Sequence, residues 1–264
     1  MEQSIFREDS WRSNRHFLNP SKWKEYELHV CGLGFLNKIN LFKDYFEKFT
    51  PIDPIEEQSL VNLNKKTTLH IIRKDLILSE KKLLDTYNFK LIKTWGTLIL
   101  NLEKEIKLDE NTLKNIRKGE KRLEFFQVIN LEDLTQYYTL FKDSRKKIKF
   151  KTTSFKEYEK IFSLNGYKIF VVRDKESKNI VAGLGTISNH IYLLEVNAAR
   201  DDKYFFANDF LKWKIINYCK ENNLKYYDFA GVNPVPKQNS KDLNLRKFKE
   251  KWGGEFYFEF IFKR

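Results

Sequence analysis

The sequence predicts a mixed α/β fold in which helices flank a central sheet. Three strand-like segments between residues 167 and 197 follow one another closely with turn residues between them, which is typical of an antiparallel meander. A strand, a helix and a strand then follow between residues 190 and 231, and this order predicts a right-handed parallel crossover. A chain of 264 residues with 41% hydrophobic and 16% aromatic side chains has ample material for the core of such a sheet.

The N-terminal part of the chain has a weaker pattern. Apolar residues at helical spacing predict an amphipathic helix that ends before Pro51. They are Leu41, Phe42, Tyr45, Phe46 and Phe49. From Leu69 onward, LHIIR, SEKKLLDTYN and TWGTLILNL predict a strand, a helix and a strand. We therefore expect a short, partial α/β region over residues 1–95 and a main domain over residues 96–264.

The main domain begins with a cationic helix. Asp109 can cap this helix, and Gly119 is its visible stop signal. Its exposed positions include Lys114, Arg117, Lys118, Lys121 and Arg122. The strand FFQVIN follows, and then two helices, LEDLTQYYTLFKDS and SFKEYEKIFSL, which the basic loop RKKIKFK separates.

The meander consists of the segments YKIFVVR, IVAGLGTIS and HIYLLEVN. The crossover helix ends at Asn222, and its apolar face is Ala207, Leu211, Ile215 and Tyr218. The strand KYYDFAG, a short helix DLNLRKFKEKW and a final strand EFYFEFIF complete the chain. Gly253 and Gly254 allow the sharp reversal before that strand.

Charge and cysteine content limit the partners and the compartment. Forty-nine Lys and Arg residues against 36 Asp and Glu leave a net charge of +13, which would attract RNA, nucleotide pyrophosphates or anionic lipid head groups, although an AT-rich genome alone would also produce it. Cys31 and Cys219 are too few for a disulfide framework and fit a reducing compartment. Because no signal-peptide pattern or long apolar stretch occurs, we expect a cytoplasmic protein, with peripheral membrane association allowed.

Most familiar catalytic motifs are absent from the sequence. It has no phosphate-binding P-loop, no GxGxxG, no GxSxG and no HExxH motif, and its four histidines are isolated from one another. We therefore expect no metal site and no metal or redox cofactor.

The order of meander, crossover helix and further strand resembles the Gcn5-related N-acyltransferase (GNAT) fold. In that fold, the resemblance implies, a glycine-containing loop before the crossover helix holds the pyrophosphate of acyl-CoA. The corresponding segment here, NAARDDKYFFAND, has no glycine and places two aspartates at the expected helix N-terminus. These carboxylates would repel a pyrophosphate, so a different acyl donor is expected.

A more specific resemblance covers residues from about 95 to the C-terminus. The segments TLILNLEKEIKLDENTLKNIRKGEKR, IVAGLGTIS, NDFLKWKIINYCKENNLKYYDFAGV and LRKFKEKWGGEF resemble the FemABX family of aminoacyl-tRNA-dependent peptidyltransferases, a branch of the GNAT superfamily. The resemblance implies aminoacyl-tRNA as donor and an amine on a UDP-linked or lipid-linked cell-wall precursor as acceptor. The short N-terminal part departs from the two-domain pattern of that family.

The resemblance implies a role for one lysine, and the residues around it suggest further site candidates. Lys249, in FKEKWGG, occupies the position whose cation would stabilise the oxyanion formed at the attacked carbonyl, although it could also be one of many solvated lysines. Phe248 either stacks on the aminoacylated adenosine or packs in the core. Asp228 ends an apolar strand, where a carboxylate is either a proton acceptor or part of a structural ion pair. Tyr192 and Tyr227 either line the gap between the parallel strands or lie in the core.

Three cations in the basic clusters are candidates for phosphate contacts, although such clusters often face solvent. They are Arg117, Arg145 and Lys147. Taken together with this resemblance, the sequence leads us to expect an N-acyltransferase that moves an aminoacyl group from aminoacyl-tRNA to an amine on a peptidoglycan precursor or a related cell-surface building block. The alternatives are an acyl-CoA-dependent enzyme acting on an amino sugar or surface polysaccharide, and a non-catalytic RNA-binding module. We expect no stable DNA partner.

Overall fold

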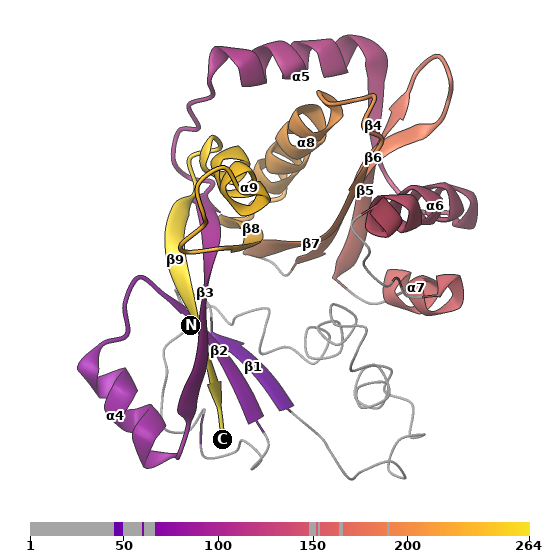
Figure 1. Cartoon of the computed structure of the whole chain (residues 1–264). Coiled ribbons are helices and arrows are strands. Elements are labelled where there is room, and N and C mark those ends of the chain that lie inside the picture. Colours follow the sequence, from indigo (N-terminus) through magenta and orange to yellow (C-terminus); the bar gives the residue numbers. More distant parts are fainter. Residues whose placement is uncertain are drawn as a thin grey trace. The chain divides into compact units, whose positions relative to one another are not determined.

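The computed structural model describes residues 45–49, 60, 67–147, 152, 154–163, 166–188 and 191–264. The described residues fall into two compact units (Figure 1). Unit 1 takes in the described residues among 1–100, 229–250 and 254–264, and unit 2 takes in those among 101–228 and 251–253. The predicted boundary between residues 95 and 96 lies inside strand β3 (Lys90–Asn101), and the division into domains 1–95 and 96–264 stays a prediction.

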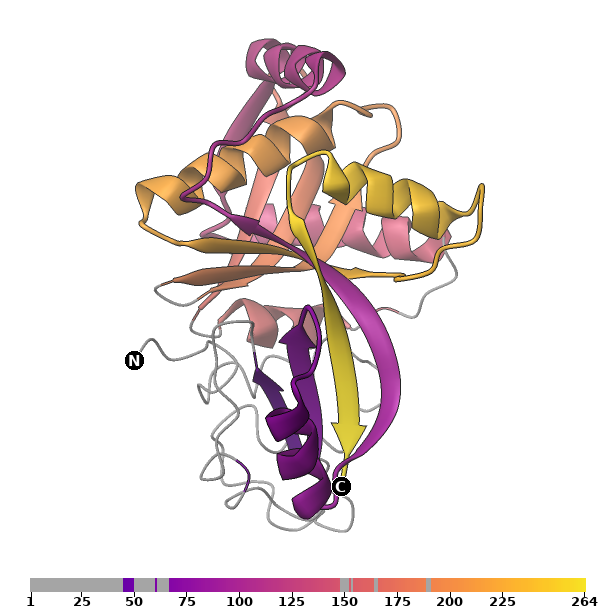
Figure 2. The same ribbon diagram turned by 90° about the vertical axis from the view of Figure 1, so that its left-hand side faces the viewer.

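Unit 1 is built on a sheet with the strand order β1-β2-β9-β3 (Figure 2). Its remaining elements are β1 (Tyr45–Phe49), β2 (Thr67–Arg73), α4 (Leu78–Thr86), α9 (Lys241–Glu250) and β9 (Glu255–Lys263). Strand β1 runs parallel to β2, whereas β9 is antiparallel to both β2 and β3. The predicted strand, helix and strand after Leu69 are therefore confirmed.

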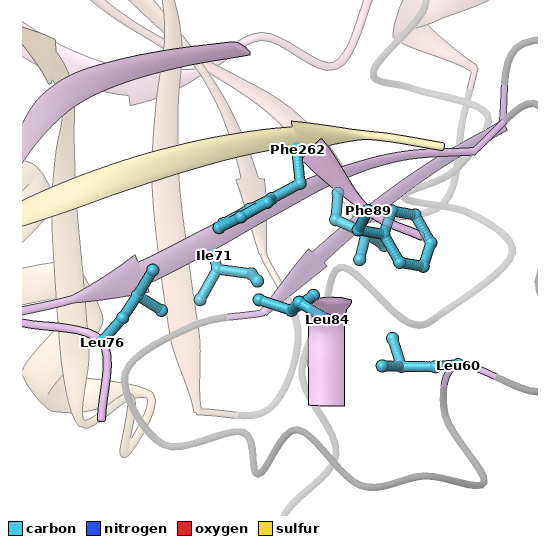
Figure 3. Packing of buried hydrophobic residues seen from close by; sticks show 7 residues of the cluster. Leu60, Ile71, Leu76, Leu84, Phe89 and Phe262 are labelled. Carbon is cyan, nitrogen blue, oxygen red and sulfur yellow. The ribbon is translucent and has the colours of Figure 1, made fainter. Parts of the chain in front are cut away.

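Side chains from distant parts of the sequence form the core of unit 1 (Figure 3). They are Leu60, Leu69, Ile71, Leu76, Leu84, Phe89 and Phe262. Leu84 comes from α4 and Phe262 from β9, so burial of these apolar side chains fixes the helix against the sheet.

The prediction of an amphipathic helix before Pro51 is wrong for its described part. Residues Tyr45–Phe49 form β1, which pairs with β2 through Tyr45↔Thr67 to Phe49↔Ile71. Pairing with a strand that lies far along the chain overrides the local helical spacing. Leu41 and Phe42 lie outside the described residues.

Unit 2 is built on a mixed sheet with the strand order β8-β7-β6-β5-β4. Its elements are α5 (Glu110–Arg122), β4 (Leu123–Gln127), α6 (Leu131–Lys147), α7 (Phe155–Phe162), β5 (Tyr167–Asp174), β6 (Ile180–Ser188), β7 (Tyr192–Arg200), α8 (Ala207–Glu221) and β8 (Tyr226–Val232), which runs on into unit 1. The antiparallel meander β5-β6-β7 and the parallel pair β7-β8 are confirmed. Helix α8 covers one face of this sheet with α5 outside it, and α6 and α7 cover the other (Figure 1). The predicted mixed sheet with flanking helices is thus confirmed.

The glycines of IVAGLGTIS allow aromatic rings to lie directly on β6. A Cβ atom at Gly183 would come within 2.5 Å of the Tyr137 ring, and one at Gly185 would meet the Tyr167 side chain. Tyr137 in turn donates a hydrogen bond of 2.9 Å to the Asn197 carbonyl on β7. Gly183 is therefore needed because α6 packs closely on the sheet, and Gly185 is needed because the Tyr167 side chain of β5 lies against it.

Two predicted helix limits are wrong. Asp109 does cap α5, since its carboxylate accepts from the Thr112 amide at 2.7 Å, but Gly119 does not end the helix. Instead, a Cβ atom at Gly119 would collide with Phe210 of α8, so glycine permits close packing of the two helices. The basic segment 145–147 is the last turn of α6 and not a loop, and the rest of the predicted loop, residues 148–151, lies outside the described residues. Basic side chains in a last turn are favoured by the helix dipole.

Candidate functional site

Lys249 lies in the last turn of α9 and is only 7% exposed. Its ammonium donates hydrogen bonds to the carbonyls of Ala230 (3.2 Å) and Gly231 (2.9 Å), which belong to the C-terminal part of β8. A buried ammonium is costly unless its N–H groups have acceptors, and these two carbonyls supply them. Lys249 is therefore held at a defined position and is not one of the solvated lysines.

The backbone that holds Lys249 has an unusual conformation. Ala230 has a φ of +60°, in the left-handed region that residues other than glycine rarely adopt. The next residue, Gly231, is exposed, and a Cβ atom there would come within 2.8 Å of the Trp95 indole nitrogen. The Lys93 ammonium lies 4.6 Å from the centroid of the Trp95 ring. Trp95 and Lys93 thus extend the surface around Gly231, and sequence reasoning did not single them out.

The rest of the FKEKWGG segment is divided between the two units. Phe248 belongs to unit 1 and is half-buried. Trp252 belongs to unit 2 and is fully buried, and its indole N–H has no hydrogen-bond partner among the described residues. Lys251 donates to Asp209 of α8 at 2.5 Å, and Gly253, at φ +82°, allows the predicted reversal into β9. Lys251 and Trp252 therefore anchor the segment in unit 2.

Asp228 and Tyr192 meet in unit 2. Asp228 is completely buried on β8, and its Oδ2 accepts a hydrogen bond of 2.8 Å from the Tyr192 hydroxyl on β7. Tyr192 is also buried and lies 6.1 Å from the Tyr226 ring, measured between centroids. The structure thus joins two of the predicted residues. Lys249 belongs to unit 1.

A second polar group lies beneath α8, and the sequence predicted only one of its members. The Tyr227 hydroxyl donates to Glu195 Oε1 at 2.6 Å, and Lys212 of α8 forms an ion pair with the same oxygen. All three side chains are buried. Burial and the Glu195 carboxylate raise the pKa of Tyr227 well above its ordinary value, so the phenol keeps its proton.

The sequence does contain a signal for this group. Lys212 precedes the buried residues Ile216 and Cys219 by four and seven positions, which places a charge on the buried face of α8. Glu195 is a charge within the otherwise apolar part of a strand. A charge at each of these positions predicts a buried ion pair.

The three predicted phosphate-binding residues do not gather in one place. Arg117 is exposed on α5, which lies on the opposite face of the sheet from α6 (Figure 1). Arg145 is half-buried with its guanidinium 5.0 Å from the Phe141 ring centroid, and burial lowers its pKa. Lys147 is exposed and pairs with Asp202 at 2.7 Å, which raises the pKa of the lysine.

Of these three, only Lys147 lines a surface pocket of about 560 Å³. The lining residues are Leu140, Asp143, Ser144, Lys146, Lys147, Arg200 and Asp201. Both acidic and basic side chains line this pocket, so it is not a purely cationic phosphate site.

The expectation that two aspartates lie at the N-terminus of the crossover helix is wrong. Asp201 and Asp202 lie in the loop before α8, which begins at Ala207. The acid in its first turn is Asp209, which accepts from Asn115 at 2.7 Å and from Lys251. The Ala207 amide already donates to the Tyr204 carbonyl at 2.9 Å. A local turn thus uses one of the backbone N–H groups at the helix start, where a pyrophosphate would bind.

Three further properties concern the described residues alone. The described residues contain no group of three or more His, Cys, Asp or Glu side chains placed to hold a metal ion. None of the helices they form is long and apolar enough to cross a bilayer. Burial raises the pKa of the Cys219 thiol, which keeps it from acting as a thiolate nucleophile.

Comparison with known proteins gives matches to both the sequence and the fold. The Lipid II:glycine glycyltransferase of Staphylococcus haemolyticus (strain JCSC1435) is 30% identical over 69 residues, which are 26% of this chain and 16% of that protein. The chain therefore spans only a small part of this relative.

Two solved structures share the fold. FemX superposes with a TM-score of 0.64 at 14% identity, over 84% of this chain and 82% of FemX. L-PGS from Bacillus licheniformis superposes with a TM-score of 0.58 at 13% identity, over 75% of this chain and 67% of L-PGS. Residues 170–261, which include Asp228 and Lys249, match the FemAB family, and over this segment the resemblance predicted from the sequence is confirmed.

Proposed function

We propose that this protein is an aminoacyltransferase that moves an aminoacyl group from aminoacyl-tRNA to an amine on a lipid-linked peptidoglycan precursor. The observation that carries the proposal is Lys249, held on the carbonyls of Ala230 and Gly231 within the segment that matches the FemAB family. The match to a lipid II:glycine glycyltransferase supports the class of acceptor. Because charged tRNA is the donor, the reaction belongs in the cytoplasm.

The reaction converts an ester into an amide. The acceptor amine attacks the ester carbonyl, a C–N bond forms, and the C–O bond to the terminal ribose of the tRNA breaks. The proton lost by the amine ends on the released ribose hydroxyl, so no metal or redox cofactor is required. The Lys249 ammonium would donate to the oxyanion of the tetrahedral intermediate, an interaction worth about 3 to 4 kcal/mol in comparable sites.

The start of α8 supports tRNA as the donor in preference to acyl-CoA. The loop from residue 201 to 206 has no glycine, and buried Phe206 occupies the N-cap position. The Ala207 amide already donates to the Tyr204 carbonyl, so this backbone N–H group is not available to a pyrophosphate. An acyl-CoA-dependent enzyme and a non-catalytic RNA-binding module are the competing outcomes of the test.

The test compares Lys249→Ala with Lys247→Ala, a matched control that removes an exposed lysine from the same helix. Purified protein receives labelled aminoacyl-tRNA or labelled acyl-CoA together with a lipid-linked precursor, and label in a stable amide is measured. We expect transfer from tRNA, a loss of about 100-fold to 1000-fold in Lys249→Ala, and little change in the control.

Three other results would contradict the proposal. Transfer from acyl-CoA alone would show that acyl-CoA, and not aminoacyl-tRNA, is the donor. Binding of charged and uncharged tRNA alike without any product would favour the RNA-binding module. Unchanged transfer by Lys249→Ala, with its folding confirmed by circular dichroism, would remove the proposed role of the lysine.

A further inference from the structure

Helix α5 presents a cationic outward face. Its buried side is made of Thr112, Ile116 and Gly119. Its exposed cations are Lys114, Arg117, Lys118, Lys121 and Arg122, which we call the α5 cationic face. Arg122 pairs with Asp174 at 3.4 Å. Within the described part of the chain, no carboxylate pairs with Lys114, Arg117 or Lys121, so most of this charge is turned toward solvent.

An exposed phenylalanine lies beside the α5 cationic face. Phe205, in the loop before α8, has 58% of its surface accessible to solvent. The Lys118 ammonium lies 5.1 Å from the Phe205 ring centroid and 4.6 Å from that of Phe206, which is buried. The two rings meet edge to face, with centroids 5.8 Å apart. Packing on Phe206 and Lys118 therefore holds Phe205 in an outward position, next to the charges.

We propose that the α5 cationic face and Phe205 dock the protein on an anionic membrane surface. Lysine and arginine side chains at such a surface are attracted to lipid phosphates, and a neighbouring aromatic ring favours the interface between head groups and acyl chains. A helix of 13 residues is about 20 Å long, so its outward side can lie along a flat layer of head groups. The proposal extends the proposed function, since a lipid-linked acceptor would be met at that surface.

The aromatic side chains favour a membrane over single-stranded RNA. Binding of single strands without sequence preference uses several outward-facing rings, on which successive bases stack. In this loop, Phe206 is buried and Tyr204 is half-buried, which leaves Phe205 as the single outward ring of the three. One apolar anchor surrounded by cations fits insertion into an interface better than a stacking platform.

The test measures flotation of the full chain with vesicles of phosphatidylcholine, with and without phosphatidylglycerol. We expect binding that requires the anionic lipid and weakens with salt. Phe205→Ala should weaken it, and the pair Lys114→Glu with Lys121→Glu should weaken it by at least about 25-fold, at about fivefold for each cation lost and more for the carboxylates gained. The matched controls are Ile129→Ala, an exposed apolar residue elsewhere in unit 2, and Lys142→Glu with Lys146→Glu on the exposed side of α6.

Transfer to a water-soluble precursor analogue, without vesicles, separates this proposal from the proposed function. Variants that lose vesicle binding but keep this transfer would support both. If no donor gives transfer and the variants still lose vesicle binding, the docking proposal is supported and the proposed enzymatic function is wrong. Wild-type vesicle binding by the variants, binding that the control charge reversals weaken equally, or loss of tRNA binding in place of vesicle binding would overturn the docking proposal.

Discussion

At the scale of single residues, the backbone conformation of Ala230 and the position of the Lys249 ammonium depend on each other. A left-handed conformation costs an L-residue about 1 to 2 kcal/mol, and Ala230 adopts it at φ +60°. In that conformation, the successive carbonyls of Ala230 and Gly231 both accept hydrogen bonds from the Lys249 ammonium. Bonding of the buried ammonium offsets the local strain, and strain of this kind is often kept at functional sites.

A substitution at Ala230 that opposes the left-handed conformation should therefore displace Lys249, although it leaves the lysine side chain itself unchanged. Ala230→Gly accepts the left-handed conformation, so transfer and thermal stability should stay close to those of the original chain. Ala230→Val is β-branched and opposes that conformation, so it should lower the free energy of unfolding by about 1 to 3 kcal/mol. It should also lower kcat more than it raises KM for the donor, at a temperature at which both variants are folded. Full transfer activity in Ala230→Val would show that Lys249 does not depend on this backbone.

At the scale of elements, the Glu195, Lys212 and Tyr227 group joins α8 to the parallel strands. Glu195 is on β7, Tyr227 is on β8, and Lys212 is on the helix that connects these strands. Removing one partner of a buried ion pair leaves a charge without compensation, whereas replacing both partners with apolar side chains is often close to neutral. The pair thus fixes how the helix sits on the two strands more than it adds to stability.

Urea unfolding of single and double variants tests this view of the crossover. Lys212→Met and Glu195→Leu should each lower the free energy of unfolding by about 3 to 5 kcal/mol. The double variant should recover most of that loss, because neither charge is then left buried alone. Lys220→Met, on the exposed side of the same helix, is the control and should change little. Additive losses in the double variant would mean that the two side chains do not act as a pair.

Elements were predictable from the sequence where their pattern is local. The meander and the crossover follow from turn residues, strand composition and the handedness of the connection, and all of these can be read within about 70 residues. Strand β1 was mistaken for a helix because its pairing with β2 is not a local property. Gly119 was mistaken for the end of a helix because glycine is needed there to make room for the Phe210 side chain, which lies far along the chain.

The residues of the candidate site also differ in whether a local sequence pattern indicates them. Lys249 was singled out because its motif is continuous in sequence, and its catalytic role stays a prediction. The left-handed Ala230, the indole of Trp95 beside Gly231, and the pairing of Glu195 with Lys212 arise from contacts between distant segments. Periodicity alone does not identify such contacts, although a charge on the buried face of a helix does indicate where one must occur.

At the scale of the whole molecule, the chain passes between the two units four times. Strand β9, at the C-terminal end, depends on β2 and β3 as its neighbours. A cut between residues 95 and 96 removes β2 entirely and leaves β3 only from Gly96 onward. Residues 259–263 of β9 would then lose their strand partners on both sides.

The fragment 96–264 should consequently fail as an independent domain. Its unpaired strand end carries Phe260 and Phe262, and Phe262 is buried in the intact chain. An exposed, apolar strand edge promotes association between molecules, so we expect the fragment to elute as large oligomers in size-exclusion chromatography and to melt at a lower temperature than the full chain. Phe260→Lys with Phe262→Lys in the same fragment should restore a monomer, since charges on an edge strand prevent pairing. A soluble, monomeric fragment with the melting temperature of the full chain would instead establish residues 96–264 as a domain that folds without the N-terminal region.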